Sequence, residues 1–150
     1  MMPIQFITEG NGLEYPLALL HQSAFPEHEY WKPEDFKTLM ALPTHSACVY
    51  MDKENVMLGF LFYSKIIDEA EIVTFAVSPF FQGRGIGKAI LEQFIKKMKM
   101  ENIKSVFLEV AEDNKKAYQL YCNYNFEVQT KRVDYYGKNK NAYLMLKSLS

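Results

Sequence analysis

A glycine-rich turn between an apolar segment and an amphipathic segment is the feature that most constrains this chain. The turn reads SPFFQGRGIGKAI (residues 78–90), and its glycines Gly83, Gly85 and Gly87 are accompanied by Arg84 and Lys88. Residues 70–77 before it are apolar and β-branched, and residues 86–98 after it repeat apolar side chains every four positions. A strand, a glycine turn and a helix in this order present free backbone N–H groups and the positive end of the helix dipole. The turn therefore predicts a site for an anion such as a phosphate.

The spacing of the glycines separates this turn from two common nucleotide-binding loops. A P-loop needs Ser or Thr after its lysine, and here Lys88 is followed by Ala89. A Rossmann loop carries GxGxxG near the start of a βαβ unit, whereas GxGxG here follows three strand-like segments. A glycine turn that binds nothing is the simplest alternative, but such a turn does not need three glycines and two cations.

The remaining elements predict one mixed sheet with helices packed on it. Strands are expected at 4–8, 46–51, 56–64, 70–77, 105–110, 126–133 and 142–147, and helices at 13–24, 33–43, 86–98 and 114–122. The short breaks between the second, third and fourth strands predict an antiparallel meander. No linker or repeat interrupts the chain. We expect a single α+β domain over residues 1–150, with a mostly antiparallel sheet of about seven strands flanked by four helices.

Composition and charge argue against several functional classes. The net charge of −1 provides no basic field for a nucleic acid. The two cysteines and three histidines lack the spacing of a disulfide framework or a metal site. There is no signal-peptide pattern, and no apolar run approaches the roughly 20 residues of a membrane helix. We expect a cytoplasmic monomer or homodimer without a metal, a membrane or a nucleic-acid partner.

The stretch QGRGIGKAIL (82–91) resembles the signature of the GCN5-related N-acetyltransferase (GNAT) family. Further resemblance is carried by AFP (24–26), DEAEIVTFAVSPFFQGRGIGKAIL (68–91), LEVAEDNKKAYQLY (108–121), NF (125–126) and RVDYY (132–136). Within the family, the chain is most similar to the RimI-type ribosomal-protein alanine N-acetyltransferases. The resemblance implies the GNAT fold, with two strands splayed apart at a site for acetyl-coenzyme A (acetyl-CoA), and transfer of the acetyl group to an amine.

The resemblance also assigns residues to the cofactor. It implies that the backbone of Phe75, Ala76 and Val77 lies along the thioester arm, although these residues otherwise read as buried strand. It implies that the pyrophosphate is bound by Gln82, Gly83, Arg84, Gly85, Ile86, Gly87 and Lys88. Asn114 is a good residue to cap the following helix, and its family counterpart also contacts the cofactor.

Two side chains are candidates for proton transfer. Glu109 lies in the apolar segment VFLEV, where a carboxylate is costly to bury without a purpose, and its family counterpart is the base, acting directly or through water. An outward-facing glutamate is the alternative. Tyr121 occupies the position of the family's thiol-protonating tyrosine, and Tyr118 is its nearest competitor. Cys122 points about 100° away from Tyr121 around the helix, so we expect direct attack in a ternary complex rather than an acyl-cysteine.

The acceptor is less constrained than the cofactor. We expect a groove between residues 26–36 and the turn at 132–141, with Trp31, Tyr135 and Tyr136 contacting the acceptor and Glu27 and Glu29 flanking a basic N-terminus. Compared with the family, EHEYW (27–31) looks long, GKNKN (137–141) looks short, and Ala111 replaces a common arginine. The expected acceptor is the N-terminal α-amino group of a protein such as a ribosomal protein. Small-molecule amines, a lysine side chain and a non-catalytic acyl-CoA-binding module remain alternatives.

Overall fold

The computed structural model describes residues 3–8, 12–26 and 29–150. Its helices and strands follow the predicted order, with ends that differ from the predicted ones by a few residues. They are β1 (Ile4–Ile7), α1 (Glu14–Ala24), α2 (Pro33–Met40), β2 (His45–Met51), β3 (Met57–Ile66), β4 (Glu69–Val77), α3 (Ile86–Met100), β5 (Ser105–Ala111), α4 (Lys115–Asn123), β6 (Glu127–Arg132) and β7 (Ala142–Ser148). A short 3₁₀ turn at Pro79–Phe81, which was not predicted, joins β4 to the glycine turn.

The strands form one mixed sheet in the order β1-β2-β3-β4-β5-β7-β6. The β4–β5 pair is parallel, and the other neighbouring strands run antiparallel. The predicted meander corresponds to β2, β3 and β4. The described residues therefore confirm the predicted α+β fold, a seven-stranded sheet with four α-helices.

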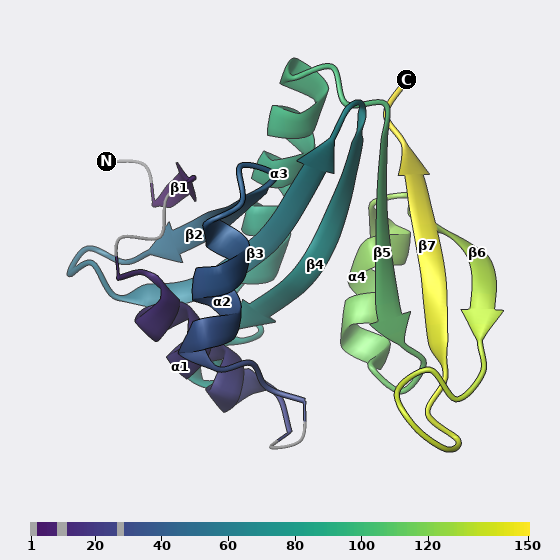
Figure 1. The fold of residues 1–150 in the computed structure, drawn as a ribbon, viewed down its shortest axis with the longest axis horizontal. Helices are drawn as coiled ribbons and strands as arrows, with labels where there is room; N and C mark the ends of the chain where they lie inside the picture. Colours follow the sequence, from purple (N-terminus) through teal and green to yellow (C-terminus); the bar gives the residue numbers. More distant parts are fainter. Residues whose placement is uncertain (1–2, 9–11, 27–28) are drawn as a thin grey trace.

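The helices cover both faces of the sheet and bury two separate hydrophobic clusters. In Figure 1, α1 and α2 lie in front of β2–β4, whereas α3 and α4 lie behind the sheet. Phe94 and Met98 of α3 belong to the rear cluster, and Leu17 of α1 and Phe36 of α2 to the front cluster. Because each face is covered, β3 is almost continuously apolar, and seven of its ten residues are buried.

Strands β4 and β5 pair at one end and separate at the other. Residues Glu69–Ile72 pair with Ser105–Leu108, and the pairing stops there. An irregularity in the β3–β4 register, between the pairs of Phe62 and Tyr63, leaves Val73 without an opposite residue in β3. Figure 1 shows the two strands diverging below this point. The predicted splay is confirmed, and it leaves one edge of residues 73–77 without ladder partners from β5.

Close packing of α3 against β3 fixes the position of the splayed strand relative to the glycine turn. A Cβ atom on Gly59 of β3 would lie 3.0 Å from Ile90 Cδ1 and 3.2 Å from the Ala76 carbonyl oxygen. Only glycine lets the helix approach the sheet this closely without displacing a neighbour. Gly59 therefore helps to place the first turn of α3 beside the end of β4.

Candidate active site

The glycine turn leads directly into the N-terminus of α3. Gly83 and Gly85 have φ angles of 79° and 83°, a conformation that side chains with a Cβ rarely adopt. Gly85 is the N-cap of α3, and the space around a Cβ added to either glycine is empty to 4 Å. The first amide groups of a helix have no partner within it. Open backbone N–H groups and the helix dipole meet here, as an anion site requires.

The side chains of the turn have different roles. Gln82 donates a hydrogen bond from Nε2 to the Val77 carbonyl oxygen at 3.1 Å and so closes the turn onto β4. The guanidinium of Arg84 lies 5.0 Å from the centre of the Phe81 ring. Lys88 is exposed on the first turn of α3. The two cations are thus available beside the backbone site.

Gly87 marks the point where three elements meet. It lies in the first turn of α3 and lacks the positive φ of Gly83 and Gly85. A Cβ at this position would lie 3.5 Å from Val77 and 3.8 Å from Phe75 of β4, and 3.8 Å from Leu120 of α4. The predicted thioester residues, the predicted phosphate turn and α4 are therefore brought together at the opening between β4 and β5.

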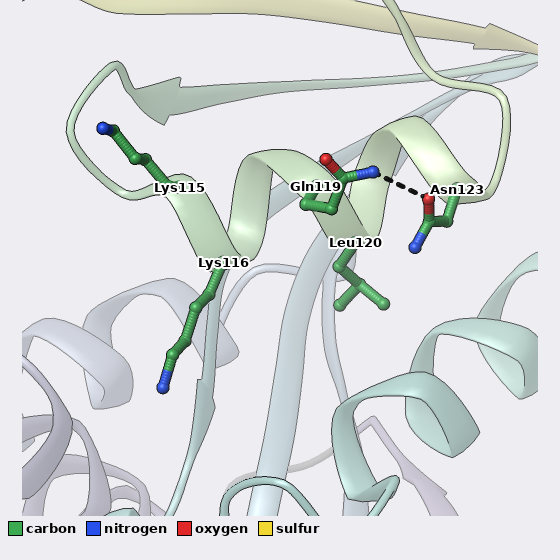
Figure 2. Close-up of a pocket in the computed structure, with 5 residues that line it drawn as sticks. All are labelled: Lys115, Lys116, Gln119, Leu120 and Asn123. Atoms are coloured by element: carbon green, nitrogen blue, oxygen red, sulfur yellow. Dashed lines mark hydrogen bonds between the residues drawn. The ribbon is translucent and has the colours of Figure 1, made fainter.

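A pocket of about 520 Å³ lies along α4 on this side. It is lined by Lys115, Lys116, Gln119, Leu120 and Asn123. Figure 2 shows Lys116 and Leu120 pointing to the same side of the helix. Asn114 caps α4 as predicted, since its Oδ1 accepts a hydrogen bond from the Ala117 amide at 3.3 Å. Lys116 adds a cation that sequence reasoning did not single out.

Tyr121 is the buried phenol of α4. Its side chain is 5% exposed, and its ring centre lies 6.4 Å from that of Phe75 and 5.5 Å from that of Phe126. Burial, together with the nearby Tyr136, raises its pKa. The ring of the competing Tyr118 instead contacts that of Tyr143 of β7, and the interaction with Cys122 raises the pKa of Tyr118. The ring of Tyr121 thus lies beside Phe75 of the splayed strand.

Glu109 lies on the face of β5 opposite to α4. Val106, Leu108 and Val110 alternate with it and are buried in the rear cluster. Its Oε1 forms an ion pair with Arg132 Nε at 3.3 Å, and its side chain is 18% exposed. Its Oε2 is buried and has no partner with hydrogen-bond geometry among the described residues. The predicted base is therefore a largely buried carboxylate with one oxygen free to accept a proton or hydrogen bond.

The turn after β6 brings two phenols to this carboxylate. The side-chain interaction with Glu109 is the main cause that raises the pKa of Tyr135, and burial adds to it. Burial raises the pKa of Tyr136 to about 12, with contributions from Tyr135, Glu109 and Glu29. Tyr136 also contributes to the raised pKa of Tyr121, so it interacts electrostatically with both proton-transfer candidates. The charge of Glu29, from the segment after α1, is among the causes that raise the pKa of Tyr136.

Trp31, the third predicted acceptor residue, lies in the front cluster. Its ring contacts Phe36 and Phe62, and its backbone N–H donates to His21. It also lines a second pocket, of about 380 Å³, with residues of α1. Within the described part of the chain, the ring contacts and hydrogen bond of Trp31 therefore all go to front-face residues, His21, Phe36 and Phe62. Glu27 and His28, from the same segment, lie outside the described residues.

Three residues beside the site were not identified from the sequence. Arg132 reaches Glu109 only because β6 and β5 flank β7, an order that no local pattern reveals. Burial raises the pKa of Glu71 on β4, and the charge of Glu109 raises it further. Gly59 could have been identified from the sequence, because a lone glycine in an apolar segment such as 57–62 often marks a close approach of two backbones.

None of the described helices is long and apolar enough to span a membrane. A group of three or more His, Cys, Asp or Glu side chains placed to hold a metal ion was not found in that part of the chain.

Comparison with known proteins bears on the chemistry of this site. Residues 14–126 match the acetyltransferase (GNAT) family. The ribosomal protein bS18-alanine N-acetyltransferase of Haemophilus ducreyi is 32% identical over 100 residues, which cover 64% of this chain and 68% of that one. The N-alpha-acetyltransferase RimI of Mycobacterium tuberculosis is 30% identical over 133 residues, 85% of this chain and 82% of that protein.

The fold is also that of a solved relative. The crystal structure of the ribosomal-protein-S18-alanine N-acetyltransferase from Escherichia coli superposes with a TM-score of 0.86 at 22% identity, and covers 98% of this chain and 94% of that one. The open N–H groups of the glycine turn and the unpaired edge of β4 fit an extended phosphorylated thioester such as acetyl-CoA. The chain belongs to the acetyltransferase (GNAT) family and is an N-acetyltransferase that uses acetyl-CoA.

Proposed function

We propose that this enzyme acetylates the N-terminal α-amino group of a protein, with a ribosomal protein as its acceptor in the cytoplasm, by direct attack in a ternary complex. The similarity to enzymes named for bS18 alanine acetylation supports this acceptor class. An amine must be deprotonated before it can attack a carbonyl carbon, and an α-amino group with a pKa near 8 is mostly protonated at neutral pH. The site must therefore supply a base on the side where the amine enters.

The observation that carries the proposal is the free oxygen of Glu109. Glu109 Oε2 is buried without a hydrogen-bond partner in the described part of the chain, at the place where β5 has parted from β4. A buried acceptor left unsatisfied costs about 1–3 kcal/mol, and an incoming amine or its bridging water would satisfy it. Glu109 then takes the amine proton as the N–C bond forms.

Arg132 balances the charge of this base. Its guanidinium holds Oε1 at 3.3 Å and leaves Oε2 available. The ring of Tyr135, 5.5 Å from the same guanidinium, helps to hold this arrangement.

Tyr121 provides the proton for the departing thiolate from the other face of the sheet. Its raised pKa keeps the phenol protonated at neutral pH. The ring contact with Phe75 places it beside the strand segment that we propose binds the thioester, residues 75–77. The backbone of that segment would hold the thioester, and the first turn of α3, with Arg84, Lys88 and Lys116, would hold the phosphates.

The carboxylates and phenols around Glu109 suit a cationic peptide end. Glu29 and Glu109 both act on Tyr136, and Glu71 lies near Glu109 on the neighbouring strand. This cluster attracts an ammonium group, whereas the phenols offer hydrogen bonds and flat surface to peptide groups. We propose Tyr135 and Tyr136 as acceptor contacts; the position of Trp31 in the front cluster favours a supporting role.

The test is an acceptor panel assayed by thiol release from acetyl-CoA and by mass spectrometry of the product. The panel contains four acceptors. Two are peptides: one with the N-terminal residues of bS18, and the same peptide with its N-terminus blocked and an internal lysine added. The other two are spermidine and an aminoglycoside. We expect acetylation at the α-amino group, with kcat/KM at least tenfold above the other acceptors.

Two results would change the assignment. Preferred turnover of the blocked peptide or of a small amine would replace the protein N-terminus by that acceptor class. Tight acetyl-CoA binding without turnover of any acceptor would favour the non-catalytic binding module.

A further inference from the structure

His21 is a buried histidine that the proposed mechanism does not use. It lies in α1 and is 2% exposed. Its ring stacks on Phe25, with centres 4.1 Å apart and an interplanar angle of 15°. A buried polar ring of this kind needs partners for both nitrogens, and it has them in two segments that are distant in sequence.

Both ring nitrogens of His21 are hydrogen-bonded. The Trp31 backbone N–H donates to Nδ1 at 3.0 Å, and Nε2 lies 3.0 Å from Thr74 Oγ1. Because a backbone N–H can only donate, Nδ1 carries no proton, and Nε2–H donates to the threonine hydroxyl. Burial lowers the pKa of His21 to about 4, against the opposing field of Asp35, so this neutral tautomer persists at neutral pH.

The two partners belong to the two sides of the proposed site. Thr74 follows the β3–β4 irregularity and comes directly before the proposed thioester segment, residues 75–77. Trp31 belongs to the connection between α1 and α2, whose described part also holds Glu29. Since the charge of Glu29 adds to the raised pKa of Tyr136, we take this connection as one wall of the proposed acceptor groove.

We propose that His21 is a positioning residue that ties the acceptor wall to the splayed strand. A neutral imidazole accepts from Trp31 and donates to Thr74, which fixes the distance between the wall and the strand segment that follows. The inference rests on the proposed function, because only an acceptor groove on this face gives the tie a role in the reaction. Among the described residues, the hydrogen bonds and ring contacts of His21 go to Thr74, Trp31, Phe25, Phe36 and Phe60, so it acts on the proposed site through these neighbours.

The test removes the hydrogen bond between His21 and Thr74 by substituting Thr74 on the strand. Thr74→Val keeps the shape and strand preference of the side chain but removes the hydroxyl, and Thr74→Ser keeps the hydroxyl as the matched control. With the bS18 N-terminal peptide and acetyl-CoA, we expect Thr74→Val to raise the acceptor KM about fivefold to tenfold. The KM for acetyl-CoA should stay within twofold, and Thr74→Ser should resemble the unaltered enzyme.

The chain's single tryptophan, Trp31, gives a readout that does not depend on activity. Acrylamide should quench its fluorescence more strongly in Thr74→Val than in Thr74→Ser. An unchanged acceptor KM in Thr74→Val, or an equal rise in both variants, would overturn the positioning role while leaving the proposed function intact. An unaltered enzyme that acetylates none of the panel acceptors would instead overturn the proposed function, and the positioning role with it.

Discussion

The two sides of the proposed site are built from different parts of the chain. The cofactor side, residues 75–77 and 82–88, offers mostly backbone: an unpaired strand edge and the N–H groups that follow Gly83 and Gly85. The acceptor side consists of the side chains of Glu109, Arg132, Tyr135 and Tyr136. Backbone geometry can be kept by many sequences, whereas a side-chain cluster changes with each substitution. The difference explains how one fold can retain its cofactor and vary its acceptor.

A substitution on the acceptor side should therefore slow acetyl transfer without weakening the binding of acetyl-CoA. Glu109→Gln keeps the size of the side chain and removes its basicity. We expect kcat with the bS18 peptide to fall by about 10²–10⁴, the usual contribution of general base catalysis. Stopped-flow acetyl transfer and calorimetric binding of acetyl-CoA measure the two effects.

The control for this change is Glu71→Gln, which removes a neighbouring carboxylate. We expect its kcat to stay within threefold of the unaltered enzyme. Equal losses in the two variants would mean that negative charge, not a base, is what the site needs.

Lowering the pH should destabilise the front cluster, which lies next to the acceptor side. The unfolded chain protonates His21 below about pH 6.5, whereas the folded protein resists until about pH 4. The unfolded state therefore binds more protons in this window, and the free energy of unfolding falls as the pH drops. The loss attributable to His21 is up to ~3 kcal/mol.

Urea unfolding at pH 7 and pH 4.5, followed by Trp31 fluorescence, measures this loss. His45, whose pKa is also lowered by burial, acts in the same direction, so the relevant quantity is the difference between the unaltered protein and His21→Gln. If the stability of the unaltered protein and that of His21→Gln depended on pH in the same way, His21 would not be the cause of the loss.

The smallest expected effect lies on the cofactor side. Gly85→Ala places a Cβ in the open space at a φ of 83°, where an L-residue is strained by about 1–2 kcal/mol. We expect acetyl-CoA affinity to fall about tenfold, because the turn relaxes away from its binding shape.

Gly12 offers a matched control. It has a φ of 86° and equally open surroundings, but it precedes α1 and lies outside the proposed site. Gly12→Ala should lower stability to a similar extent and leave acetyl-CoA affinity unchanged. A loss of affinity in both variants would show that general destabilisation, not the turn, is responsible.

Local patterns in the sequence predicted most of the fold. The periodicity of residues 86–98, the meander and the glycine turn each follow from contacts within a short segment. The cap at Asn114 is local as well. The splay between β4 and β5 was expected only by resemblance, because it depends on where a parallel pairing ends.

Long-range contacts limited the prediction of the site. Glu109 stood out because a carboxylate interrupts an apolar strand, but its partner Arg132 comes from a strand two places away in the sheet. Trp31 was expected to contact the acceptor, yet its ring packs on Phe36 and Phe62. The bond from His21 to Thr74 spans 53 residues, a distance over which no sequence pattern operates.

Hydrogen–deuterium exchange with each ligand in turn tests the two-sided site most directly. Acetyl-CoA alone should protect the amides of residues 75–77 and 86–88. Adding the bS18 peptide to the enzyme with coenzyme A should then extend protection to residues 132–136 and leave the first turn of α3 unchanged. Protection of 132–136 by acetyl-CoA alone, or of 86–88 by the peptide, would contradict the account.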